Sequence, residues 1–180
     1  MSIPSLVEAG VEAGVLALQT NDLYHSDNCP EKGCVMTSMA AIAGVLGGPK
    51  TLGARPKMAA DWQSVIEGGM PVGAAEALKR AIALPDSQLA ALLGISEKTL
   101  SRARAGHGRL DPVASDRLFR VARIGALAIG VLESETRAVN WLKRPQVGLG
   151  SRTPLSFLTT DAGRDQVEKL LLRIEHGVYS

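Results

Sequence analysis

The chain has 180 residues, of which 46% are apolar and only 3% aromatic, with 19 Gly and 9 Pro. This length suits one ordinary domain or two small ones. Because sheets depend on β-branched and aromatic side chains, the composition favours several short helices and an all-α fold. The net charge of +2 is uneven: residues 1–70 hold four basic and seven acidic side chains, and residues 71–130 hold nine and five. The basic middle segment suits a phosphate backbone.

The cysteines, the N-terminal residues and the longest apolar stretch indicate the compartment and whether the chain enters a membrane. Two cysteines, Cys29 and Cys34, define no disulfide framework. The N-terminus lacks the basic flank and compact apolar core of a signal peptide. The apolar stretch 124–132 is far shorter than the roughly 20 residues that a bilayer-spanning helix needs. We therefore expect a soluble, cytoplasmic protein with no membrane partner.

Residues 1–70 have the least regular pattern. Glycines interrupt their apolar stretches, and two segments rich in Gly, Pro and polar residues are typical of loops. We expect an N-terminal extension, partly flexible, with one or two short helices. A structural zinc site needs four well-placed ligands, and four nearby candidates lack such spacing: His25, Asp27, Cys29 and Cys34. With no nucleophile motif present either, we expect no metal, no cofactor, no catalytic residue and no enzyme activity.

Residues 71–132 contain two short helices joined by a tight turn. The first is predicted from Asp86 to Gly94 and the second from the N-cap Ser96 to Gly106. The connection of about three residues is typical of a helix-turn-helix. This pattern predicts a DNA-binding domain over 71–132.

A longer helix follows in the same segment. Asp111 as N-cap and Pro112 at the first helical position are a favoured start. Its apolar face is expected to comprise Val113, Leu118, Phe119, Ala122 and Leu127.

The second short helix has a polar and basic outer face. Leu100 is expected to face the core, which leaves side chains that hydrogen-bond base edges or phosphates in a major groove. These candidate DNA-binding residues are Ser96, Lys98, Thr99, Ser101, Arg102 and Arg104. The alternative is an unrelated helical hairpin with a solvated basic face.

Residues 133–180 are predicted to form a small helical domain. A helix capped by Ser134 is followed by a loop rich in Pro and Gly, and a last helix begins near Asp161. The last helix carries apolar residues at the spacing of a buried stripe: Val167, Leu170, Leu171 and Ile174.

Two parts of the sequence resemble known families. The order "LA..LGIS..TLSR" within 89–102 resembles the helix-turn-helix of Xre-type, Cro-like repressors. The C-terminal segment resembles the C-terminal domain of Xre-type antitoxins of the MbcA/ParS/Xre family. The features that carry this second resemblance are the Trp141–Leu142 pair, Pro145, the "TPL" of 153–155, Thr160 with Gly163, and the "RIEHGVY" of 173–179.

This resemblance implies two partners and one assembly. Antitoxins of this family neutralise RES-domain toxins, which degrade NAD or transfer ADP-ribose from it, by obstructing the toxin's active-site cleft. The helix-turn-helix implies operator DNA, repression of the chain's own operon and a homodimer. The residues expected to bind the toxin are Trp141, Arg173, His176, Gly177, Val178 and Tyr179.

Some alternatives stay open. Trp141 is suited either to packing beneath the last helix or to an interface. The protein as a whole is an antitoxin, a plain repressor whose C-terminal domain only dimerises, or an interaction protein that does not bind DNA.

Overall fold

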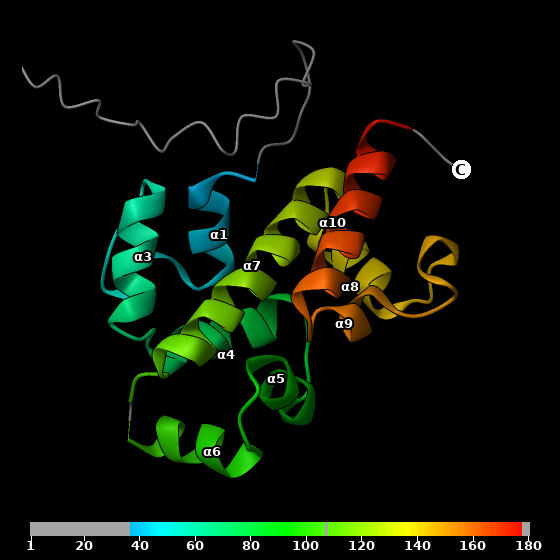
Figure 1. The fold of residues 1–180 in the computed structure, drawn as a ribbon. Helices are drawn as coiled ribbons and strands as arrows, with labels where there is room; N and C mark the ends of the chain where they lie inside the picture. The colour runs from blue at the N-terminus through cyan, green and yellow to red at the C-terminus, as the bar shows by residue number, and fades with distance from the viewer. Residues whose placement is uncertain (1–36, 107, 178–180) are drawn as a thin grey trace, which may run out of the picture. The chain divides into compact units, whose positions relative to one another are not determined.

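The computed structural model describes residues 37–106 and 108–177, and every regular element in these ranges is a helix (Figure 1). The all-α fold predicted from the sequence is confirmed for this part of the chain. No helix in it is long and apolar enough to cross a membrane. The four zinc-ligand candidates considered above, His25, Asp27, Cys29 and Cys34, lie outside the described residues.

Three helices precede the predicted DNA-binding segment: α1 (Met39–Val45), α2 (Gly48–Leu52) and α3 (Ala59–Glu67). Both α1 and α3 pack against α7 (Pro112–Leu132). Ile42, Leu46 and Trp62 are buried, and the Trp62 ring lies 4.8 Å from the ring of Phe119 on α7. This part of the N-terminal region is therefore packed into the core, whereas its sequence had suggested loose organisation.

The next three helices are α4 (Val72–Ala81), α5 (Asp86–Leu93) and α6 (Glu97–Ala105), and the last two form the helix-turn-helix. Both short helices lie where the sequence predicted them. α5 packs against α4, α6 and α7. It buries Leu89, Leu92 and Leu93, which meet the buried Leu100 of α6 in the same core. Apolar burial thus fixes how α6 is presented.

Helix α7 begins as its sequence predicted. The Asp111 carboxylate accepts a hydrogen bond from the Ala114 N–H at 2.8 Å, and Pro112 is the first helical residue. The helix runs for 21 residues and contacts α1, α3, α5, α8 and α10. It is therefore the central element of the described part of the chain.

The predicted apolar face of α7 is confirmed at Leu118, Ala122 and Leu127, which are buried. Phe119 is half-buried. Val113 is an exception, with 61% of its surface exposed, because the first turn buries the neighbouring residues of the helix instead.

The C-terminal elements are α8 (Glu135–Lys143), the 3-10 helix η2 (Val147–Leu149), α9 (Pro154–Phe157) and α10 (Asp161–Glu175). The predicted start of the last helix at Asp161 is confirmed. Val167 and Leu171 are fully buried, while Leu170 and Ile174 are half-buried. The predicted stripe therefore anchors α10 on the core.

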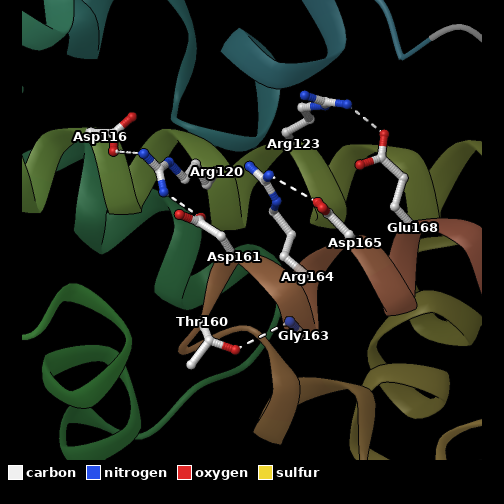
Figure 2. A network of polar contacts seen from close by, with 9 residues as sticks. All are labelled: Asp116, Arg120, Arg123, Thr160, Asp161, Gly163, Arg164, Asp165 and Glu168. Atoms are coloured by element: carbon white, nitrogen blue, oxygen red, sulfur yellow. Dashed lines mark hydrogen bonds and ion pairs between the residues drawn. The ribbon is translucent and has the colours of Figure 1, made fainter.

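Ion pairs on the surface join α10 to α7 (Figure 2). Arg120 of α7 bonds both Asp116 and Asp161, and Arg123 lies 2.5 Å from Glu168. The hydrogen bond from Arg120 lowers the pKa of the Asp161 carboxyl. Partly exposed pairs of this kind add little stability, so their main effect is to set the position of α10 along α7.

A substitution in α3 tests whether the first helices belong to the core. Trp62→Ala removes a ring that is 2% exposed and should lower the free energy of unfolding by about 3–5 kcal/mol. Met58→Ala, at a side chain that is 65% exposed, should change it by less than about 0.5 kcal/mol. Denaturant unfolding measures both. Equally small changes in the free energy of unfolding for both variants would show that α3 is not part of the core.

Candidate functional site

The turn between α5 and α6 depends on Gly94. Its φ of 68° lies in the left-handed region that side chains resist. A Cβ there would also lie 1.6 Å from Nη1 of Arg117, which donates a hydrogen bond to the Leu93 carbonyl at 3.1 Å. Ile95 packs against the core next to the turn. The left-handed backbone conformation is therefore the reason for glycine here, because the exposed Arg117 side chain could move away from a Cβ.

Helix α6 starts at a capped N-terminus. The Ser96 hydroxyl accepts a hydrogen bond from the Thr99 N–H at 3.0 Å and lies 2.8 Å from Oγ1 of Thr99. Along the helix, Leu100 is fully buried and Ala103 half-buried. Five of the six predicted DNA-binding residues are exposed: Ser96, Lys98, Thr99, Ser101 and Arg102. Lys98 and Arg102 lie on the face opposite Leu100, whereas Ser96 is the cap residue at the start of the helix.

The sixth predicted DNA-binding residue, Arg104, has other partners. Its Nη1 and Nη2 donate to the two carboxylate oxygens of Asp86 at 2.7 and 2.8 Å, and its Nε donates to Glu76 at 2.6 Å. Arg104 lies four residues after Leu100 and so shares its inward face. Its guanidinium connects α6 to α4 and α5. It is therefore not part of the exposed face of α6.

The Arg104 cluster has a strong effect on titration. The two hydrogen bonds from Arg104, and then the bond from Lys79, hold the pKa of the Asp86 carboxyl far below its usual range. The same pairing raises the pKa of Arg104. Helices α4, α5 and α6 therefore share one charge cluster behind the exposed face.

The predicted toxin-binding residues fall into two places. Arg173, His176 and Gly177 lie together at the C-terminal end of α10 and are exposed. Trp141, on α8, is half-buried and packs against the core, consistent with the packing alternative. Val178 and Tyr179 lie outside the described residues.

The start of α10 explains the Thr-x-x-Gly part of the resemblance. The Thr160 hydroxyl accepts a hydrogen bond from the Gly163 N–H at 3.1 Å (Figure 2). A Cβ on Gly163 would lie only 2.2 Å from the Phe157 carbonyl oxygen. The glycine therefore lets α9 and α10 meet closely, and this contact directs α10 along α7.

The fold and the exposed face of α6 define a helix-turn-helix protein with an added C-terminal helical domain. Residues 61–123 match the antitoxin Xre-like helix-turn-helix domain, and residues 127–177 match the antitoxin Xre/MbcA/ParS C-terminal toxin-binding domain. The first match starts within α3, earlier than the boundary predicted at residue 71. The division into 1–70, 71–132 and 133–180 stays a prediction.

Three proteins named Antitoxin Xre are similar to this chain. The one from Yersinia enterocolitica is 32% identical over 116 residues, 64% of this chain and 78% of that protein. The one from Photorhabdus laumondii is 30% identical over 118 residues, 65% and 80% of the two chains. A Pseudomonas putida protein is 44% identical over 63 residues, 35% and 40% of the two chains. The chain belongs to the Xre antitoxin family, with a helix-turn-helix and a C-terminal toxin-binding domain, and the family is non-enzymatic.

Acid titration tests the charge cluster at α5. Because the pKa of Asp86 is lowered by folding, its stabilising effect is complete above the ordinary value of 3.8 and is lost as the pH falls below it. The melting temperature of the unchanged chain should thus exceed that of Asp86→Asn at pH 6, and the gap should narrow towards pH 2.

The control is Gln88→Ala, an exposed neutral change on the same helix. Its difference from the unchanged chain should stay constant over the same pH range. A gap between the unchanged chain and Asp86→Asn that is also constant would contradict a role for the Asp86 carboxylate.

Proposed function

We propose that this antitoxin neutralises a RES-domain toxin, one that degrades NAD or transfers ADP-ribose from it, by covering the toxin's active-site cleft. The observation that carries the proposal is the match of residues 127–177 to a toxin-binding domain. The exposed end of α10 supports the location, because Arg173, His176 and Gly177 are exposed there among the described residues. Arginine and tyrosine are frequent interface anchors, and Tyr179 follows directly in the sequence.

The second half of the proposal is repression of the chain's own operon. The exposed side chains of α6 include two cations one turn apart, Lys98 and Arg102, which suit phosphate or guanine contacts in a major groove. A homodimer would present two such helices to a two-fold operator.

Co-expression with a RES-domain protein encoded by the neighbouring gene tests the first half. The unchanged chain should restore growth and co-purify with the toxin. Deleting residues 176–180 should weaken the complex by at least roughly tenfold, because it removes the proposed anchors, while operator binding stays intact. If the truncated chain rescues growth and binds the toxin with unchanged affinity, residues 176–180 do not bind the toxin. Absence of any complex with the unchanged chain would favour the plain repressor.

Arg102→Ala tests the DNA-binding half. The operator affinity should fall by roughly tenfold or more and depend less steeply on salt, because one cationic contact is lost. Melting temperature and toxin affinity should not change, since Arg102 is exposed. Arg173→Ala is the matched control and should weaken toxin binding alone. Unchanged operator binding by Arg102→Ala, measured by fluorescence anisotropy, would contradict the assignment of α6 as the DNA-reading helix.

A further inference from the structure

The segment between α8 and α9 folds into a compact loop, here called the Val147 loop (residues 146–152). Gln146 and Arg152 form an antiparallel bridge, with the Gln146 N–H donating to the Arg152 carbonyl at 3.0 Å. The N–H groups of Ser151 and Leu149 both donate to the Gln146 carbonyl at 3.0 Å. These internal hydrogen bonds give the loop a defined backbone conformation.

Contacts at both sides hold the Val147 loop in place. The Gln146 side-chain amide donates to the Trp141 carbonyl at 3.1 Å, at the end of α8. Leu149 is 5% exposed and belongs to the core. On the other side, a Cβ on Gly148 would lie 2.9 Å from Cδ1 of Leu170, so the loop rests directly on α10. The loop thus connects the two helices that carry the predicted toxin-binding residues.

Val147 is exposed at the tip of this ordered loop. Its side chain is 91% exposed, compared with 65% for Met58 and 61% for Val113, the other large apolar side chains that stand out in the described residues. A rigid backbone that holds an apolar group in water is pre-organised for burial by a partner, because little ordering is left to be done on binding.

The surroundings of Val147 are basic. Residues 143–152 contain three cations and no acidic residue. Arg144 and Arg152 are exposed, and the Arg152 guanidinium lies 4.5 Å from the centre of the Phe157 ring, which holds its position. The loop therefore fits an apolar recess bordered by carboxylates.

We propose that Val147 is an anchor for the toxin, inserted into an apolar recess with an acidic rim next to the surface that receives the end of α10. This inference rests on the proposed function. Two observations favour the toxin over DNA or a second copy of the chain. The loop lies inside the matched toxin-binding domain, and it contacts Leu170, which is one turn before Arg173. In Figure 1 the loop lies beside α10 and well apart from α6.

The test compares two valine substitutions in the full chain. Val147→Asp should weaken toxin binding, measured by titration calorimetry, by roughly tenfold or more, because a carboxylate would meet an acidic rim. Val113→Asp, the same change at an exposed valine of α7, should leave the affinity within about twofold. Val147→Leu should retain binding. Melting temperature and operator affinity should be the same for all three variants.

Each other outcome would overturn the inference. Toxin affinity within about twofold for Val147→Asp, while deletion of 176–180 weakens binding, would exclude Val147 and leave the proposed function standing. Loss of operator affinity in Val147→Asp would show that the loop contacts DNA. A changed oligomeric state of this variant would show that the loop lies between copies of the chain. If the unchanged chain does not bind the toxin, both the proposed function and this inference are wrong.

Discussion

The burial of α7 is the constraint on which the rest of the described structure depends. Ten of its 21 residues are buried, and the helix contacts elements from both ends of the described chain. A helix that is apolar on most of its circumference is stable only when other elements surround it. Here α1, α3, α4, α5, α8 and α10 all pack against it. The helix-turn-helix match ends at residue 123 and the toxin-binding match begins at 127, so both domains are built on one continuous helix.

Within α6, the position of each arginine on the helix decides its role. Arg102 is exposed, whereas Arg104, two residues later, is drawn into the cluster with Glu76 and Asp86. The buried Leu100 and the bidentate Arg104–Asp86 pair hold the helix from behind. A recognition surface needs such support, because its outer side chains act only when their backbone is fixed.

Local features of the structure could be predicted well from the sequence. The caps Ser96, Asp111 and Ser134 mark helix starts because the cap is a contact between near neighbours. The left-handed turn at Gly94 and the apolar stripe of α10 are local patterns as well. The predicted family is confirmed by the comparisons. The all-α fold and the positions of the two short helices are confirmed by the observed helices.

Contacts between distant residues could not be predicted in this way. The rings of Trp62 and Phe119 pack against each other although the residues are far apart in the sequence, so the packing of α3 was missed. Arg104 was placed on the outer face of the second helix, although its spacing of four residues from Leu100 fits the inward face. Its partners, Glu76 and Asp86, lie on two other helices. Val147 was missed because exposure in a Gly-rich loop depends on how that loop folds. Placing such residues requires the tertiary structure.

The continuity of α7 also limits how the two proposed activities could influence each other. No linker separates the helix-turn-helix from the toxin-binding domain, since both matches meet on α7, and Arg120 and Arg123 pair with α10 across the boundary. Hinge motion needs a few residues that absorb large backbone changes, and a helix interior with a packed surround offers none. A toxin bound to α10 and to the Val147 loop would therefore be held at a fixed place relative to α6. The toxin would then affect DNA binding through the volume and charge that it adds at that place, or through the spacing of two copies on an operator. It would not act by rearranging the chain itself.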